Sequence, residues 1–209
     1  MYLQINIRDD PRLDPRLRQG FVGQARKSAR LRMDSFLFAS VYSFAFKNVW
    51  LDSLIILFAA YWEYVVPAVL LLYLWTPKSK RDELKTRAVV VGMSIFSAVV
   101  ARFGFASLIR YFYPRERPFV FEGINSLVSQ DPLEASFPSG HATFFMAIAV
   151  YLLLSGRKKL GWFMFASAIL IGVARVGAGV HWPSDVIAGW ILGALVSLVI
   201  FKLSSRHIK

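Results

Sequence analysis

The sequence predicts an all-α membrane protein, a polytopic helical bundle with five clear transmembrane spans. Of its 209 residues 56% are hydrophobic, and the mean hydropathy of +0.48 exceeds that of an ordinary soluble domain. The charged residues gather between long apolar stretches. These stretches show no strand-like alternation, and an open sheet cannot cross lipid with unpaired backbone groups. We therefore expect each stretch to be a helix.

Five apolar stretches are the candidate spans. A hydrocarbon layer of roughly 30 Å takes about 20 helical residues, and most of the stretches come close to or exceed that length. The third is short by its hydropathy, although a start near Phe137 would lengthen it. The five ranges are 49–75, 88–110, 141–155, 160–176 and 184–203.

The loops indicate the orientation of the chain in the cytoplasmic membrane. The connection 77–87, the turn 156–159 and the C-terminal tail are basic, and short basic loops remain in the cytoplasm. The other connections, among them the long loop 111–137, then lie on the extracytoplasmic side. Arg115 and Arg117 break the charge rule in this outer loop, and we expect them to attract phosphate.

The N-terminal region is less regular. Residues 1–34 form a polar, basic segment ahead of a membrane-embedded domain over residues 35–209. Residues 35–46 are apolar but short, so they form either an interfacial helix or a tilted sixth span. The chain has no cysteine, which excludes disulfides and thiolate metal sites. The net charge is +12, and the basic residues lie in the loops and at the ends of the chain. We therefore expect membrane lipids and no nucleic acid as partners.

Three short stretches place polar groups at the outer ends of helices. They are "RYFYPRERP", "FPSGH" and "ARVGAGVHWPSD", and the predicted topology brings all three to the same side of the membrane. Their candidate phosphate-binding residues are Arg110, Arg117, Ser139, Gly140 and Arg175, and their candidate catalytic residues are His141, His181 and Asp185.

Each of these groups suits a phosphate. A guanidinium group can donate two parallel hydrogen bonds to phosphate oxygens, and a serine beside free backbone N–H groups at a helix N-terminus binds anions. Gly140 lets the backbone approach closely. Taken singly, an arginine at a helix end usually reaches toward lipid headgroups, and a lone histidine is more often structural. Their joint occurrence on one side of the membrane indicates a phosphate site.

The two histidines and the aspartate suggest phosphoryl transfer. His181 and Asp185 are four positions apart, so one helical turn can bring the carboxylate to the imidazole. Asp185 would hold one ring nitrogen and leave the other free to attack phosphorus, while His141 would protonate the leaving oxygen. Three arginines would neutralise the transferring group. No cluster of carboxylates flanks the motifs, so we expect neither a metal nor another cofactor.

Together the three stretches resemble the signature motifs of the type 2 phosphatidic acid phosphatase superfamily. Their order and spacing match, and the resemblance covers roughly residues 50–203. It implies a metal-independent helical phosphatase that forms a phosphohistidine intermediate. His181 would be the nucleophile, Asp185 its partner and His141 the acid, and the phosphate would be bound by Arg110, Arg117, Ser139, Gly140 and Arg175.

Two positions depart from the motifs of that family. The first motif usually opens with Lys, and Arg110 keeps the charge in a different geometry. The third usually has Ser where this chain has Ala174, so one hydroxyl contact to phosphate is missing. Neither change removes a group that the mechanism needs.

Within the family, "VWLDSLI" and "LEASFPSGHAT" resemble the bacterial undecaprenyl-diphosphate phosphatases. Such enzymes convert the polyprenyl carrier from diphosphate to monophosphate for cell-wall biogenesis. Phosphatases of phosphatidylglycerol phosphate or phosphatidic acid share all three motifs and remain an alternative. The five spans argue against soluble acid phosphatases and haloperoxidases, and the complete motifs argue against a non-catalytic transporter or scaffold.

Two charged residues, Glu63 and Arg102, lie inside the predicted spans. An unpaired charge inside a membrane is costly, and we expect an ion pair between them beside the phosphate site. The alternative is that Arg102 reaches the headgroups and Glu63 is neutral.

Aromatic residues settle at membrane interfaces. The candidates to line a substrate entrance are Tyr111, Phe119 and Phe121, with Phe112 and Tyr113 beside them, and the alternative is that they only anchor the loop.

Overall fold

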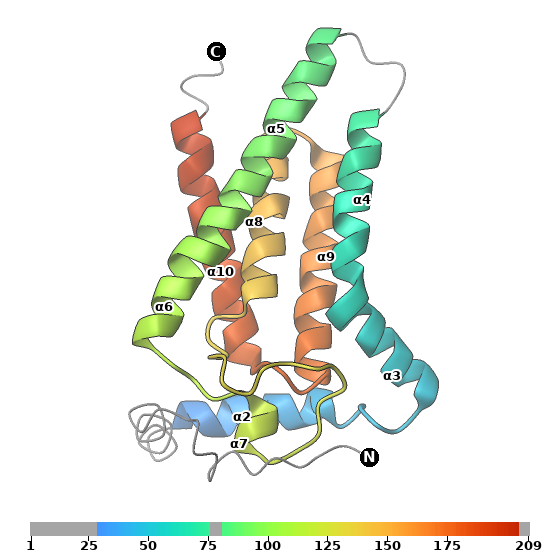
Figure 1. Ribbon diagram of the computed structural model, residues 1–209, viewed down its shortest axis with the longest axis vertical. Coiled ribbons are helices and arrows are strands. Elements are labelled where there is room, and N and C mark those ends of the chain that lie inside the picture. Colours follow the sequence, from blue (N-terminus) through green and yellow to red (C-terminus); the bar gives the residue numbers. More distant parts are fainter. Residues whose placement is uncertain (1–28, 76–80, 205–209) are drawn as a thin grey trace.

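The computed structural model describes residues 29–75 and 81–204, and within these ranges it consists of helices and loops without a strand. The helices form an elongated bundle (Figure 1). In chain order they are α2 (Ala29–Tyr42), α3 (Val49–Ile56), η2 (Leu57–Tyr61), α4 (Trp62–Trp75), α5 (Arg81–Val99), η3 (Val100–Ala106), α6 (Ser107–Phe112), α7 (Pro118–Phe121), α8 (Gly140–Leu154), α9 (Lys158–Gly177) and α10 (Pro183–Ser204).

Four helical runs are long and apolar enough to cross a membrane: Val49–Trp75, Asp82–Phe112, Lys158–Gly177 and Pro183–Ser204. The third predicted span is the 15-residue apolar helix α8, which packs at the centre of the bundle against α5, α9 and α10. The prediction of an all-α polytopic membrane protein is confirmed.

The expected lengthening of α8 toward Phe137 is wrong, because the helix begins at Gly140. Pro138 has no N–H group to donate, and its carbonyl accepts hydrogen bonds from Arg110 instead of from the helix. Ser139 precedes the helix with extended backbone (φ −65°, ψ 116°). These residues therefore belong to the site at the end of the bundle and not to the span.

Helices α8 and α10 touch through their backbones. A Cβ atom placed on Gly189 would lie 2.7 Å from the carbonyl oxygen of Ser139, and one on Gly193 would lie 2.3 Å from that of Thr143. The two glycines are four positions apart, so both face the same neighbour. This contact brings the N-terminal ends of the two helices, which carry two of the three motifs, close together.

The first two spans each contain a π-helical segment, η2 and η3, and both segments lie toward the motif-bearing end. Single π-turns frequently occur at functional sites, because the extra residue redirects side chains and frees a carbonyl. Here the carbonyl of Ala59 in η2 accepts a hydrogen bond from Arg175 at 3.2 Å. Beyond the π-helical segments, α3 and α6 diverge from one another (Figure 1).

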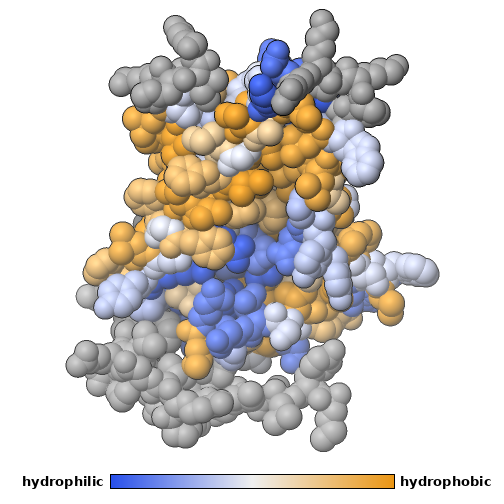
Figure 2. Space-filling model, turned by 45° about the horizontal axis from the view of Figure 1, so that its top comes forward, coloured by the Kyte–Doolittle hydropathy of each residue, from blue (hydrophilic) through white to orange (hydrophobic). Residues whose placement is uncertain are grey.

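The two ends of the bundle differ. The turn between α8 and α9, the start of α5 and the end of α10 lie at one end, whereas the loops with the motifs lie at the other (Figure 1). Figure 2 shows a face on which hydrophobic residues cover the upper part of the bundle and a hydrophilic patch lies below them. Partly exposed polar residues at the motif-bearing end include Glu63, Arg110, Glu134 and His141.

Helix α2 crosses the motif-bearing end of the bundle instead of running along it (Figure 1). Its 14 residues would extend only about 21 Å, short of a membrane span. Of the two alternatives for residues 35–46, the short interfacial helix is the one that the structure supports. The helix begins at Ala29, so the expected domain boundary after residue 34 falls inside α2. The rest of the polar segment, residues 1–28, lies outside the described residues.

Candidate active site

The three motifs meet at the end of the bundle. Arg110 lies in α6, Arg117 just before α7, Ser139 to His141 at the start of α8, and Arg175 in the last turn of α9. The third motif then continues through a short turn into α10. The eight residues that the sequence singled out are thus brought together by six different segments.

His181 is buried between an arginine and an aspartate. Its Nε2 atom lies 3.4 Å from Nη1 of Arg117, and its side chain is 1% exposed. On the other side of the ring, Nδ1 lies 3.5 Å from Oδ2 of Asp185. That contact lacks the geometry of a hydrogen bond, so the expected direct bond from Asp185 to the ring is not formed. The Nε2 atom faces the arginines, where a phosphate would bind.

Burial lowers the pKa of His181 well below its ordinary value of 6.5, and the positive charges of Arg117 and Arg175 add to this effect. The imidazole is therefore neutral at neutral pH. A neutral ring has the free nitrogen lone pair that a nucleophile requires.

Asp185 is held by partners other than the histidine. Its Oδ2 atom accepts a hydrogen bond from the backbone N–H of Trp182 at 2.9 Å, and its Oδ1 atom is 2.7 Å from Nη1 of Arg115. Nη2 of Arg115 is 2.6 Å from Asp34 of α2, which also accepts hydrogen bonds from Ser184. Both terminal nitrogens of Arg115 thus bind carboxylates, and the expectation that Arg115 attracts phosphate stays a prediction.

Glu134 joins the two arginines of the first motif. Its two carboxylate oxygens lie 2.9 Å from Nη1 of Arg110 and 2.8 Å from Nη2 of Arg117. Arg117 is 1% exposed and also donates to the carbonyl oxygens of Glu134 and Val180. Sequence reasoning missed Glu134, although it lies inside "LEASFPSGH", only five positions before Ser139.

Gln130 extends this arrangement to the third arginine. Its side-chain oxygen accepts a hydrogen bond from Nη2 of Arg175, and its Nε2 donates to Glu134 at 3.1 Å. One carboxylate and one amide of the loop thus bind all three arginines that were predicted to hold phosphate. Together they offer these arginines the kind of oxygen acceptors that a phosphate offers.

The start of α8 carries unoccupied hydrogen-bonding capacity. The Ser139 hydroxyl is buried and has no hydrogen-bond partner among the described residues. Its backbone N–H donates to the carbonyl of Asp185 at 2.9 Å, which ties α8 to α10. A Cβ on Gly140 would lie 2.8 Å from Nη2 of Arg110 and 3.3 Å from Nε of Arg102. The missing side chain leaves room for two guanidinium groups beside the helix N-terminus.

His141 is paired with a carboxylate from another helix. Its Nε2 atom lies 2.9 Å from Oε2 of Glu63, in the first turn of α4 directly after η2. The expected Glu63–Arg102 ion pair is not formed, because Glu63 binds the histidine instead. The Arg102 guanidinium lies near Gly140 and over the ring of Phe103 at 5.2 Å.

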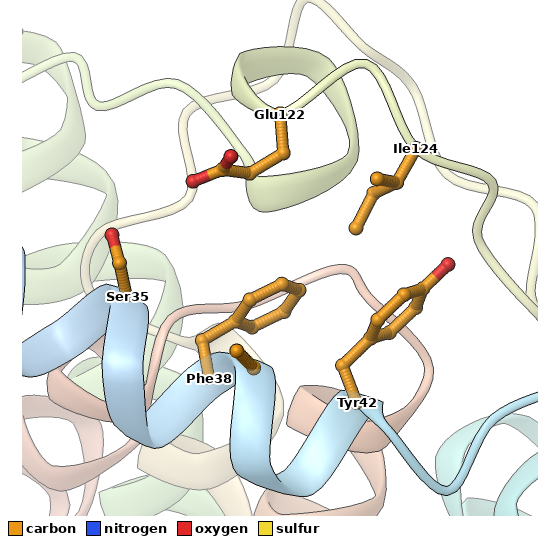
Figure 3. Close-up of a pocket in the computed structure, with 6 residues that line it drawn as sticks. Ser35, Phe38, Tyr42, Glu122 and Ile124 are labelled. Carbon is orange, nitrogen blue, oxygen red and sulfur yellow. The ribbon is translucent and has the colours of Figure 1, made fainter.

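The three aromatic residues predicted to line an entrance do not form one surface. Phe119 packs with Val180 and Ala178, whereas Phe121 packs against Trp182 with ring centroids 5.8 Å apart. Tyr111 is 81% exposed at the end of the second span. A separate hollow, lined by Ser35, Phe38, Ala39, Tyr42, Glu122 and Ile124, lies between α2 and the turn after α7 (Figure 3). It contains none of the motif residues.

Several known proteins are similar to this chain. The undecaprenyl-diphosphatase of Sulfolobus acidocaldarius is 33% identical over 133 residues, which cover 64% of this chain and 65% of that protein, just under two thirds of its length. The undecaprenyl-diphosphatase BcrC of Bacillus subtilis is 27% identical over 168 residues, 80% of this chain and 82% of BcrC. The crystal structure of Aquifex aeolicus LpxE matches with a TM-score of 0.62 at 25% identity, covering 81% of this chain and 95% of that one.

A family model described as "PAP2 superfamily" matches residues 87–209, a segment that contains all three motifs. The match covers more than half of the chain, and the protein belongs to the PAP2 superfamily.

Proposed function

We propose that this protein is a lipid phosphatase that hydrolyses undecaprenyl diphosphate to undecaprenyl phosphate. The observation that carries the proposal is the meeting of His181, His141 and three motif arginines at one end of a membrane bundle. The names of the two relatives above support the diphosphate substrate. The buried, unpartnered hydroxyl of Ser139 supports an anion site at this end.

In the first step of the proposed mechanism, the terminal phosphate displaces the side chains of Gln130 and Glu134 from the arginines. Arg110, Arg117 and Arg175 then bind its oxygens, and Ser139 and the N–H groups at the start of α8 donate further hydrogen bonds. The chain itself supplies the positive charge that stabilises the transferring group, so we propose that the reaction needs no metal.

The chemical step then proceeds from the neutral imidazole. Nε2 of His181 attacks phosphorus, forming an N–P bond while the bond to the bridging oxygen breaks. His141 donates a proton to that leaving oxygen. The Asp185 carboxylate, 3.5 Å from Nδ1, stabilises the positive charge that develops on the ring. Undecaprenyl phosphate leaves and a phosphohistidine remains.

Hydrolysis of the phosphohistidine completes the cycle. His141, now neutral, accepts a proton from a water molecule, and the water oxygen attacks phosphorus while the N–P bond breaks. Inorganic phosphate is released, and both histidines return to their starting protonation states. Glu63 remains beside His141 in both halves of the catalytic cycle, and its negative charge favours the protonated form of the imidazole.

Phosphate release from purified protein in detergent tests the proposal. The substrates are undecaprenyl diphosphate, phosphatidylglycerol phosphate and phosphatidic acid at equal concentrations. We expect the highest kcat/KM with the diphosphate and no turnover by a folded His181→Ala variant. A preference for either monophosphate lipid would contradict the proposed substrate, and an active His181→Ala variant would contradict the mechanism.

We further propose that the site faces the outside of the cytoplasmic membrane, because the basic turn at 156–159 lies at the opposite end. The chain has no cysteine, so single cysteines can be introduced for labelling. In intact cells, a membrane-impermeant maleimide should label Ser129→Cys in the outer loop but not Lys159→Cys. The reverse labelling would contradict this orientation.

A further inference from the structure

Arg102 is a cation at the site that the mechanism above leaves without a role. It lies in η3, inside the second membrane span, where an unpaired charge is costly. Over the described ranges its guanidinium makes no ion pair and no hydrogen bond, and its one aromatic contact is with the neighbouring Phe103. A half-buried arginine without a protein partner points to a ligand that brings the negative charge.

The position of Arg102 is defined by its neighbours. Its Nε atom is 3.3 Å from the point where a Cβ of Gly140 would lie, and Nη2 of Arg110 is 2.8 Å from the same point. Gly140 directly precedes His141 in α8. Arg102 therefore lies on the His141 side of the phosphate-binding arginines. It precedes Arg110 by eight residues, so its backbone lies about 12 Å deeper along the span.

The chemistry of a diphosphate places a second negative group on this side. When His181 attacks the terminal phosphorus in line, the leaving oxygen lies on the opposite side, where His141 can protonate it. In a lipid diphosphate that oxygen belongs to the second phosphate, from which the tail continues toward the hydrocarbon. In a lipid monophosphate it belongs to an uncharged alkyl group.

We propose that Arg102 binds the second, lipid-proximal phosphate and thereby makes the enzyme prefer lipid diphosphates to monophosphates. The inference rests on the proposed function and goes beyond it by naming the residue that selects the substrate class. Arg102 offers a guanidinium fork that matches two phosphate oxygens, and nothing in the described residues competes for it. A monophosphate gains nothing from this arginine.

The test separates binding from turnover. Purified full-length protein in detergent is titrated with inorganic phosphate and with inorganic pyrophosphate, and dissociation constants are obtained from the shift in thermal unfolding temperature. The variants are Arg102→Gln and Arg102→Lys. Lys85→Gln, which removes a 68% exposed charge from the same span, is the matched control. Turnover of farnesyl diphosphate and farnesyl phosphate is measured in parallel.

We expect the wild type to bind pyrophosphate more tightly than phosphate. Arg102→Gln should weaken pyrophosphate binding and kcat/KM for farnesyl diphosphate roughly ten- to hundredfold, the effect of losing one charged hydrogen-bonding group. Phosphate binding and farnesyl phosphate turnover should change less than threefold. Arg102→Lys should recover part of the loss, and Lys85→Gln should behave as the wild type.

Three results would overturn the inference: a wild type that binds both anions equally, equal losses for both anions in Arg102→Gln, or no loss for pyrophosphate. If Arg102→Gln does not fold, Arg102→Lys is judged by the same comparison, with a smaller selective loss expected. Failure of the proposed function is a different result, in which the wild type does not hydrolyse undecaprenyl diphosphate although pyrophosphate binding still depends on Arg102.

Discussion

The Nε2 atom of His141 lies 2.9 Å from Oε2 of Glu63, a residue 78 positions earlier in the chain. The contact joins the start of α8 to α4 across the site. It fixes the orientation of the imidazole and places a negative charge beside it. Glu63 is therefore expected to act as a positioning residue for the proton donor.

Replacing Glu63 with Gln keeps the shape of the side chain but removes this charge. We expect kcat to fall roughly ten- to hundredfold, the usual effect of losing one charged hydrogen bond. The loss should be smaller for p-nitrophenyl phosphate than for an alkyl phosphate, because a good leaving group needs less protonation. Glu122→Gln, an exposed carboxylate outside the motifs, is the control. An equal loss on both substrates would indicate a purely structural role.

The two histidines should differ in how their loss depends on the substrate. His181→Ala should abolish turnover of every substrate, because the ring forms the covalent intermediate. His141→Ala should lower kcat by about 10²–10⁴-fold for an alkyl phosphate and by less for a diphosphate, whose leaving group is a phosphate monoester. Single-turnover measurements with both substrates test this difference. A diphosphate that gave no partial rescue would argue against His141 as the acid.

Protein stability should depend on the protonation of His181. Its pKa is lowered in the folded protein, whereas the unfolded chain titrates near 6.5, so acidification below that pH adds a proton to the unfolded chain first. The free energy of unfolding should fall by up to about 1.4 kcal/mol per pH unit from this group as the pH decreases. Thermal unfolding at pH 7.5 and pH 5.5 should show a smaller decrease for His181→Gln than for the wild type. Identical decreases would contradict the assignment.

Glu134 should compete with phosphate for Arg110 and Arg117. In Glu134→Gln the dissociation constant of inorganic phosphate should decrease several-fold, because the anion no longer displaces a carboxylate. The variant should also unfold at a lower temperature, since Arg117 is 1% exposed and loses its ion pair. Thermal unfolding of the wild type and the variant at increasing phosphate concentrations measures both the unfolding temperature and the dissociation constant. Weaker phosphate binding by the variant would show that Glu134 supports the site instead of competing for it.

Turnover should survive chelation by EDTA, because the arginines supply the positive charge that metal ions supply in other phosphatases. Vanadate should inhibit competitively by occupying the phosphoryl position. Phosphate-release assays with and without EDTA, followed by addition of Mg²⁺, provide the measurement. A loss of activity that Mg²⁺ restores would require a different mechanism.

The local features of the site could be predicted from the sequence. Each motif combines residues within a few positions of one another, and hydropathy places the helix ends that carry them. Arg110, Ser139 and His181 therefore meet at one end of the bundle, as the order of the predicted spans requires. The exception within a motif is the His181–Asp185 pair, because Asp185 is turned toward the N–H of Trp182 and toward Arg115.

The remaining contacts depend on how distant segments pack. Glu63 contacts His141 from α4, just after η2, and a π-helical segment of this kind leaves no mark in the hydropathy. The pairing of Arg115 with Asp34 requires the position of α2, which the apolar pattern could not determine. Glu134 lies beside a motif, yet nothing in its spacing indicates that it turns back toward Arg110.

The backbone contact between α8 and α10 has a consequence for how this chain can change by mutation. Gly193, which would place a Cβ 2.3 Å from the carbonyl of Thr143, lies outside the three motifs but should be among the least replaceable positions. His141, the proposed proton donor, lies in the first turn of α8, and His181, the proposed nucleophile, lies two residues before α10, so this contact helps to set their spacing. Residues in η2 and in the loop 122–138 lie outside this contact, whereas η3 packs against both helices. Mutations in η2 and in this loop can change the headgroup preference while the spacing of His141 and His181 stays the same.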